Sequence, residues 1–551
     1  MCERISLLFL SCLLSLAIPF ISTFGQGPEL ARTSPAQAGP AAAVSTAVPP
    51  SPRSAAFAKA LNLYRSGRLG DAENEYNDLL QGDPRSALAY VGLARVYLKQ
   101  KRVTDASAAA AKAMELAPPL AAVHVAMGEV YFRQGKMDES EKEFLKEIKR
   151  GTTEARAYLG MALLYEAFSF YKSAKQMIER AYQLDPLDLD IQKNRMWTLN
   201  REEQLKALQG YLAGETNDDA EDRSGLEQEL TVLQDRISQR GRAACHLRTK
   251  ISSTAMNLEP LGYNPKRIEG VGLAAKLNGT SALLLLDTGA SGILVDRKVA
   301  EKAGIKRIVQ SNIRGIGDKG DASGYVGFAD SVQIGNLEFQ SCYVRVIDKK
   351  FSSNQDGLIG ANVFARYLVD IDFPDGKLKL SELPPRPGEL AKDSSTESDP
   401  AAEPHFYDQY IAPEMKSYTP ILRFGHDLLI PTRVNDSLPR LFLIDSGGFD
   451  DSISPTLARE VTKVSGDWDT KVKGLSGAVD KVYRADTVKI QFSHFRHERE
   501  NLVSFDTSKI SNDTGTEVAG ILGFAMLRLM DVKIDYRDGL IDFQFDPNRW
   551  H

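Results

Sequence analysis

The 551-residue sequence predicts a multidomain protein in which an all-α helical repeat array precedes an all-β region of two duplicated lobes. Small residues, tyrosines and prolines recur with a 34-residue step in the N-terminal part, as in stacked helical pairs. The C-terminal part consists of short β-type runs separated by Gly and Asn turns. Within it, the triplets Asp-Thr-Gly at 287–289 and Asp-Ser-Gly at 445–447 each end an apolar run.

The repeat is defined by residues that keep a fixed phase. Pro84, Pro118 and Pro186 are separated by one and two steps of 34 residues, and each proline ends a unit because it cannot continue a helix. The same step relates Tyr97, Tyr131 and Tyr165. This pattern resembles the tetratricopeptide repeat, with about four units over 56–189. The resemblance implies a concave surface that binds a protein or peptide. Simple packing of the array against the neighbouring domain is the alternative.

Composition excludes several classes of function. The net charge of −5 and the absence of a basic block argue against a nucleic-acid binder. No Cys/His cluster has the spacing of metal ligands, so we expect neither a metal nor a cofactor. Cys245 and Cys342 are the two cysteines beyond the N-terminal apolar run, and they could pair in an oxidising compartment.

The N-terminus carries an apolar run, residues 5–21, followed by small and polar residues. This predicts an export signal cleaved after Gly25, and therefore a periplasmic or extracellular protein. An uncleaved anchor is the alternative; no other stretch of the sequence is long and apolar enough to span a membrane. An Ala/Pro-rich spacer follows the signal.

The two β-rich lobes repeat each other in order. Gly-Leu-Ile-Gly at 357–360 matches Gly-Ile-Leu-Gly at 520–523, and 369–376 matches 532–539 with the same offset of 163 residues. A carboxylate at the end of a buried strand is costly unless it has a role. Finding it in both lobes indicates one site built from two halves of the chain.

These elements together resemble the aspartic peptidases of retroviral and pepsin type, and they are similar to bacterial aspartyl-protease-like domains with two fused retropepsin-like lobes. The resemblance covers about half of the chain, 262–545. It implies that Asp287 and Asp445 share a proton and activate water for hydrolysis of a peptide bond in a protein or peptide substrate. It also implies supporting roles around the two acids for Thr288, Gly289, Ser291, Ser446 and Gly447.

Substrate in this family is covered by β-hairpin flaps. Residues 313–320 and 472–478 occupy the corresponding places in the two lobes. Their glycines, which suit a mobile tip or a plain hairpin turn, are Gly315, Gly317, Gly474 and Gly477.

The second lobe departs from the family pattern after its triplet. Gly448 and Phe449 stand where a hydroxyl residue is usual, and Asp450 and Asp451 would raise the proton affinity of the dyad if they faced it. Three interpretations therefore stay open: an active endopeptidase, an inactive pair that works with the repeats as a peptide-binding or assembly module, and a scaffold whose acids only bind backbone N–H groups. The lobes could close on each other or across a homodimer, and the long linker favours internal closure.

The predicted domain boundaries are a signal peptide at 1–25, a spacer at 26–55, tetratricopeptide repeats at 56–189, a helical connector at 190–260, a first lobe at 261–384, a linker at 385–413 and a second lobe at 414–551.

Overall fold

The computed structural model describes residues 52–214, 216, 218–238, 245–262, 268–351, 354–387 and 407–549. The predicted signal peptide, most of the predicted spacer and the middle of the predicted linker lie outside these residues. Within the described ranges, no helix has the length and apolar character needed to cross a membrane. The same ranges contain no group of three His, Cys, Asp or Glu side chains that could hold a metal ion.

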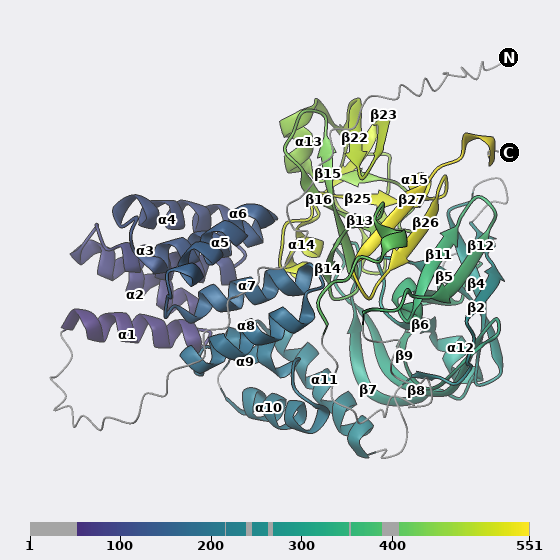
Figure 1. The fold of residues 1–551 in the computed structure, drawn as a ribbon, viewed down its shortest axis with the longest axis horizontal. Coiled ribbons are helices and arrows are strands. Elements are labelled where there is room, and N and C mark those ends of the chain that lie inside the picture. The colour runs from purple at the N-terminus through teal and green to yellow at the C-terminus, as the bar shows by residue number, and fades with distance from the viewer. Residues whose placement is uncertain are drawn as a thin grey trace. The chain divides into compact units, whose positions relative to one another are not determined.

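Residues 52–184 form four consecutive helical pairs, as the 34-residue period predicts (Figure 1). The small residues at fixed phase allow large side chains of neighbouring helices to fit between them. A Cβ on Gly160 would lie 2.2 Å from the ring of Phe144, and one on Gly92 would lie 2.3 Å from the ring of Tyr76. The helices are α1 Pro52–Arg65, α2 Leu69–Gly82, α3 Ala87–Lys99, α4 Val103–Leu116, α5 Ala121–Arg133, α6 Met137–Lys149, α7 Ala155–Ala167 and α8 Tyr171–Leu184.

The predicted helical connector, 190–260, is helical only in its first part. Helices α9 (Leu189–Met196), α10 (Arg201–Ala213) and α11 (Ala220–Ser238) are followed by strands β1 (His246–Leu247) and β2 (Ser253–Asn257). Strand β2 pairs with a strand of the first lobe, so the β-rich region begins earlier than residue 261. The extended segment is also joined to the first lobe by a disulfide between Cys245 and Cys342.

The first lobe is one sheet with strand order β1-β9-β6-β10-β5-β4-β8-β7, and β3 pairs with β4. Asn278 and Gly279, both with positive φ, form the two-residue turn between β4 and β5. The strands are β3 Glu259–Leu261, β4 Gly270–Leu277, β5 Thr280–Asp287, β6 Ile293–Asp296, β7 Lys306–Ile313, β8 Ala322–Ile334, β9 Leu337–Ile347 and β10 Gly357–Gly360, with helix α12 Arg297–Lys302 after β6.

The second lobe repeats this arrangement with the order β18-β21-β24-β17-β25-β16-β15-β22-β23, and β14 pairs with β15. Strands β19 and β20 form a separate small hairpin. The elements are β14 Leu422–Phe424, β15 Asp427–Val434, β16 Arg440–Asp445, β17 Ser452–Ile453, α13 Pro455–Val461, β18 Val464–Asp467, β19 Lys473–Gly474, β20 Gly477–Ala478, β21 Val482–Ala485, β22 Val488–Phe492, β23 Phe495–Arg499, β24 Leu502–Phe505, α14 Ser508–Thr514, β25 Gly520–Gly523 and α15 Phe524–Leu527.

A third sheet joins the two lobes, with the order β13-β27-β26-β11-β12-β2 (Figure 1). At its centre the two segments that repeat in the sequence pair with each other, since Val369 lies opposite Ile534 and Ile371 lies opposite Val532. Their apolar side chains enter the core shared by the lobes. The strands are β11 Tyr367–Asp372, β12 Lys377–Glu382, β13 Thr419–Pro420, β26 Asp531–Asp535 and β27 Leu540–Gln544.

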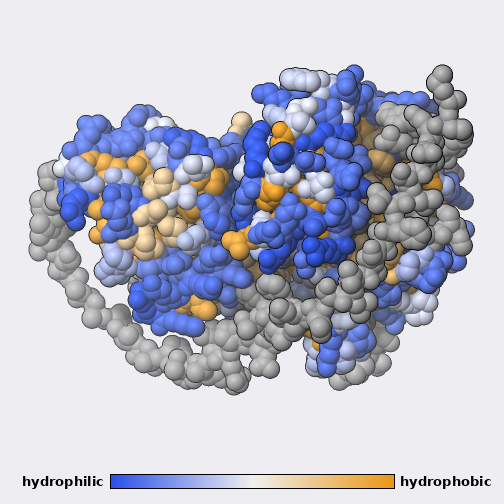
Figure 2. Space-filling model, turned by 90° about the horizontal axis from the view of Figure 1, so that it is seen from above, coloured by the Kyte–Doolittle hydropathy of each residue, from blue (hydrophilic) through white to orange (hydrophobic). Residues whose placement is uncertain are grey.

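The repeats pack directly on the second lobe. Leu159 and Leu164 of α7 belong to the same buried cluster as Leu441 and Leu443 of β16. The hydroxyl of Thr516 donates to the carbonyl of Phe132 over 2.7 Å at the end of α5. Hydrophilic side chains nevertheless cover most of the face drawn in Figure 2, with hydrophobic ones scattered among them. The array is therefore partly a packing partner of the lobe, the alternative considered above for its role.

Candidate active site

Asp287 and Asp445 occupy equivalent positions at the last residues of β5 and β16. Each of these strands runs parallel to the Gly-apolar-apolar-Gly strand of its own lobe, with Gly360 opposite Asp287 and Gly523 opposite Asp445. Those glycines allow the close approach, because a Cβ on Gly360 would lie 2.3 Å from the carbonyl oxygen of Ala290. The repeated sequence elements thus build the same local frame around each acid.

The residues that follow the two acids grip each other across the lobes. The Thr288 hydroxyl donates to the carbonyl of Ile444 over 2.8 Å and accepts from the backbone N–H of Ser446 over 2.9 Å. Reciprocally, the Ser446 hydroxyl donates to the carbonyl of Leu286 over 3.0 Å and accepts from the N–H of Thr288 over 3.1 Å. Both hydroxyl residues are buried. Four hydrogen bonds therefore hold the two acid-bearing loops together.

The two carboxyls are in hydrogen-bond contact but have different surroundings. Burial, and next the charge of Asp445, raise the pKa of Asp287 well above its usual value. Burial also raises the pKa of Asp445, against the hydrogen bond from Asp287 and the backbone N–H groups of Gly448 and Gly447. Asp445 accepts from these two N–H groups over 3.0 and 2.9 Å, whereas Asp287 accepts from Gly289 over 2.8 Å. The shared proton accordingly belongs on Asp287, and Asp445 is the better-stabilised carboxylate.

The two predicted flap segments meet each other. The N–H of Lys319 donates to the carbonyl of Ser476 over 2.9 Å, and the N–H of Ser476 donates to the carbonyl of Ile316 over 3.1 Å. Gly317 has φ of +127°, and a Cβ there would lie 2.5 Å from the carbonyl oxygen of Gly477. The glycines predicted at the tips are therefore required for the close contact between the two segments.

Leu475, between Gly474 and Gly477, carries the second flap segment into the first lobe. It packs on the cluster formed by Leu294, Ile313, Ile347 and Leu358, to which Ala290 also belongs. Since Ala290 follows the first triplet directly, this contact places the second flap segment close to the Asp287 loop. A substrate chain would have to separate or pass beneath these contacts to reach the two acids.

Comparisons with known proteins agree with this geometry. Residues 273–363 match the aspartyl protease family model, and residues 57–121 match that of the tetratricopeptide repeat. The chain combines tetratricopeptide repeats with an aspartyl protease-like domain. The repeats come first, as predicted from the sequence.

The matching relatives share only parts of the chain. DnaJ homolog subfamily C member 3 is 32% identical over 92 residues in Bos taurus and 30% over 92 residues in Homo sapiens, which is 17% of this chain and 18% of theirs. DNA damage-inducible protein 1 of Eremothecium gossypii is 28% identical over 127 residues, 22% of this chain and 26% of that protein. The matches thus span about a fifth to a quarter of the relatives' lengths. An aspartic proteinase structure from Irpex lacteus aligns with 54% of this chain and 98% of its own at 12% identity, with a TM-score of 0.31.

The departures in the second protease-like lobe do not disturb its acid. Gly448 supplies one of the two N–H groups that Asp445 accepts, and Phe449 packs against the core shared by the lobes. Asp451 is buried and faces away from the pair: it accepts from the N–H of Gly523 over 2.8 Å and lies 3.2 Å from Arg499. Burial raises the pKa of Asp451 to about 6 despite that arginine. The raised proton affinity of the pair thus has another source than Asp451.

Ser291 of the first protease-like lobe bonds to a residue that the sequence reasoning did not single out. Its hydroxyl accepts from the side-chain amide of Asn362 over 3.4 Å, and the oxygen of the same amide accepts from the N–H of Gly292 over 3.1 Å. Asn362 follows the Gly-Leu-Ile-Gly element by two residues, so the element's own neighbour fixes the loop after the first triplet. In the second lobe the N–H groups of Phe524 and Ala525 make corresponding bonds to the carbonyls of Gly448 and Phe449.

Asp427, at the first position of β15, is a further acid near the pair that sequence reasoning missed. Burial, Asp445 and Asp513 raise its pKa to about 7, and its charge also raises the pKa of Asp287. Counting back a constant distance from the two triplets aligns Asp427 with Glu269, which conceals the difference between the lobes. The hairpin register, which only the structure gives, was needed to find it.

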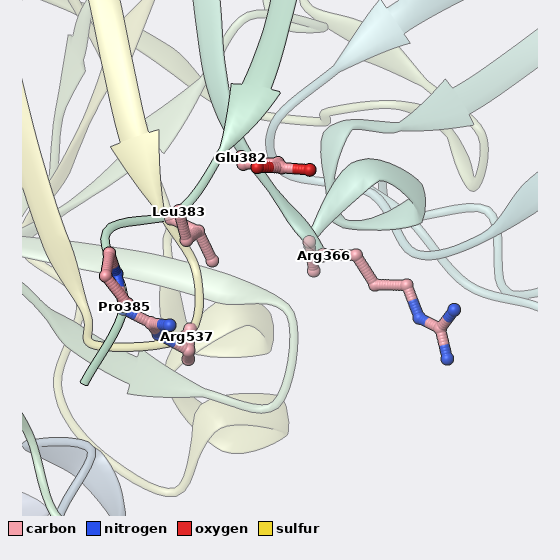
Figure 3. Close-up of a pocket in the computed structure, with 6 residues that line it drawn as sticks. Arg366, Glu382, Leu383, Pro385 and Arg537 are labelled. Atoms are coloured by element: carbon pink, nitrogen blue, oxygen red, sulfur yellow. The ribbon is translucent and has the colours of Figure 1, made fainter. Parts of the chain in front are cut away.

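A pocket of about 500 Å³ lies away from the dyad, where the linker leaves the first protease-like lobe. Figure 3 shows Leu383, Pro385 and Arg537 around it, with the Arg366 side chain extending away from them. Arg537 is held there by Asp538 at 2.8 Å and by the carbonyl of Pro384 at 2.8 Å. These contacts join linker and lobe and supply no group to the two acids.

Proposed function

We propose that the two lobes form an aspartic endopeptidase whose single active site is shared by Asp287 and Asp445. The observation that carries this proposal is the reciprocal grip between Thr288 and Ser446, because it holds both acid-bearing loops in one arrangement. A structural turn acid has no need of a partner carboxyl within hydrogen-bond distance, since that proximity costs free energy when both ionise. The site forms within one chain, which favours internal closure over a homodimer.

The unequal surroundings of the two carboxyls assign their roles in hydrolysis. Asp445, which accepts two backbone N–H groups and the bond from Asp287, is the base that takes a proton from the attacking water. Asp287 carries the shared proton and hydrogen-bonds the carbonyl oxygen of the substrate as negative charge develops on it. A proton then passes to the leaving nitrogen, and the amide bond breaks with water as the only co-reactant.

The repeat array is proposed to bind a protein, which can be the substrate or a partner. Its charged inner residues are paired with one another: Arg156 lies 2.7 Å from Asp188, 2.8 Å from Asp190 and 3.1 Å from Glu129. Because α7 packs on the second lobe, a protein held by the array is kept beside the protease-like region. The array would then raise the local concentration of substrate.

Export to the periplasm or the extracellular space is part of the proposal. The disulfide between Cys245 and Cys342 supports it, since such bonds persist in oxidising compartments. An apolar N-terminal run followed by small residues adds to that support.

The decisive experiment is digestion of an unfolded protein and a peptide library by the full mature chain between pH 4 and 8. Products should be identified by mass spectrometry, with the Asp287→Asn and Asp445→Asn variants as matched controls. The proposal expects cleavage that both substitutions abolish while the thermal transition is kept. Peptide capture without cleavage by the unaltered protein would favour the inactive, binding pair instead.

A further inference from the structure

The two lobes differ at the strand position directly opposite their acids. In the second lobe, Leu429 of β15 lies opposite Leu443 of β16, and continuing this antiparallel register by two residues places Asp427 opposite Asp445. In the first lobe, Gly272 of β4 lies opposite Leu285 of β5, and the same continuation places Gly270 opposite Asp287. Opposite residues of an antiparallel pair project to the same face. One wall of the site therefore carries a carboxyl where the other carries a hydrogen atom.

The carboxyl of Asp427 has acids on two sides and no cation. Asp445 on β16 and Asp513 on α14 face it. Asp513 is itself paired with Arg314 over 3.2 Å, so this arginine is already engaged. In the described ranges of the chain, no lysine or arginine forms an ion pair with Asp427. Its side chain retains 16% of its exposure, which leaves it open to a ligand.

His426 does not neutralise Asp427 either. Its Nε2 lies 3.5 Å from the Asp427 carboxyl, but burial and the charge of Arg345 lower the pKa of the imidazole to about 4. The ring is therefore neutral in the pH range in which Asp427 ionises. A half-buried carboxyl of this kind is stabilised by any cation that arrives next to it.

We infer that Asp427 is a specificity-determining residue that binds the side chain of a substrate lysine or arginine next to the scissile bond. This inference rests on the proposed function, since it places an extended peptide across Asp287 and Asp445. The basic side chain lies on the wall of the second lobe, because Gly270 leaves the corresponding wall of the first lobe without a charge. The protease-like region accordingly favours peptides that are basic on one side of the cleavage point.

The preference should depend on pH in a defined direction. The pKa of Asp427 is raised to about 7 by burial, Asp445 and Asp513, so at pH 5 the group is mostly protonated and attracts a cation weakly. Above pH 7 it is ionised, and the attraction for lysine or arginine is larger. The ratio of the rates for basic and apolar peptides should therefore rise between pH 5 and 8.

The test uses the full mature chain and two peptides that differ only in Lys or Leu at the residue next to the cleaved bond. The peptides are taken from the cleavage sites found in the library digestion. We expect kcat/KM to favour the Lys peptide at least tenfold at pH 7.5, and Asp427→Asn to reduce that ratio to near one. Asp427→Lys should favour a matching Glu peptide. Asp436→Asn, which removes an exposed acid from the turn after β15, should keep the original ratio.

Each remaining outcome decides between the inference and the function on which it rests. Cleavage by the unaltered protein with equal rates for both peptides overturns the role of Asp427 and leaves the endopeptidase standing. An Asp427→Asn variant whose pH profile shifts equally for both peptides also overturns it, since the acid would then only tune the dyad. Should no peptide be cleaved, the endopeptidase proposal fails. Fluorescence anisotropy of the labelled peptides then decides the role of Asp427, and equal affinities would contradict it.

Discussion

Arg386 forms a buried ion pair with Asp538 and thereby ties the segment that leaves the first lobe to the β26–β27 turn of the second. Exactly one internal repeat further on, at the offset of 163 residues, Arg549 pairs with Asp372 and lies 2.9 Å from Asp375 of the first lobe. Each lobe thus sends an arginine from its final segment to the turn of the other. The reciprocity extends the grip seen at the active site to the opposite end of the lobes.

Loss of Arg386 should therefore be costly. Arg386→Ala leaves Asp538, which has no solvent exposure, without its cation, and we expect a loss of about 3–5 kcal/mol in the free energy of unfolding. Arg549→Ala should cost less, because Arg549 is partly exposed and Asp372 keeps Lys379 at 2.7 Å. Urea unfolding of both variants measures the difference. Equal losses would contradict the unequal burial of the two pairs.

Removing one hydroxyl of the grip should destabilise the paired loops. Ser446→Ala deletes one donor and leaves the buried N–H of Thr288 without its acceptor, at a cost of about 1–3 kcal/mol. Thr288→Ser keeps the hydroxyl and serves as the control, with a smaller loss from the missing methyl group. Thermal unfolding and cleavage rate should both fall in the alanine variant. Unchanged cleavage by Ser446→Ala would show that the grip is not needed for the reaction.

Substitution of either acid of the dyad should separate activity from stability. Asp287→Asn and Asp445→Asn should each lower kcat by about 10²–10⁴-fold, the usual contribution of a positioned proton-transfer group. Each should also raise the melting temperature at pH 8, because one of the two adjacent carboxyls can no longer ionise. Differential scanning calorimetry at pH 4 and pH 8 tests this, and the gain should be absent at pH 4.

Stability should fall as the pH rises because of Asp370 in the inter-lobe sheet. Burial and the hydrogen bond with Asp531 raise its pKa to about 7, above the value of about 3.9 in an unfolded chain. The folded state therefore binds the proton more tightly, and this contribution to stability is present below pH 4 and lost by about pH 7. Asp370→Asn should flatten the pH dependence of the melting temperature between pH 4 and 7. A steeper dependence in this variant would contradict the assignment.

A side chain at the tip of the first flap segment should block its contact with the second. Gly317→Ala places a Cβ against the carbonyl of Gly477 at a φ that favours glycine. We expect KM to rise and kcat/KM to fall, by roughly tenfold for about 1.4 kcal/mol of lost contact, with little change in the free energy of unfolding. Gly320→Ala, also at positive φ but with no atom within 4 Å of the added Cβ, is the matched control for backbone strain. Similar kinetics in the two variants would show that strain, not the flap contact, is responsible.

The sequence was sufficient for features that depend on local pattern. The 34-residue step predicted the helical pairs, because small residues must recur wherever a ring such as that of Phe144 fits against the next helix. Asp287 and Asp445 were identified as a pair because the strand, triplet and glycine element around each are local and occur twice. The boundary near residue 246 was missed, since strands as short as β1 and β2 carry too few residues to show a period.

Contacts between distant residues were decided by the tertiary structure alone. The sequence showed two sets of flap glycines, but not that Lys319 and Ser476 bond to each other. It raised the question whether Asp451 faces the dyad, and the fold turned this acid toward Arg499 instead. It gave Asp427 no special place, because the turn after β15 is one residue longer than that after β4 and the register, not the count along the chain, sets which residues face each other. The sequence by itself determined which acids and repeats this protein has; only folding, which brings residues some 160 positions apart into contact, decided how those groups meet.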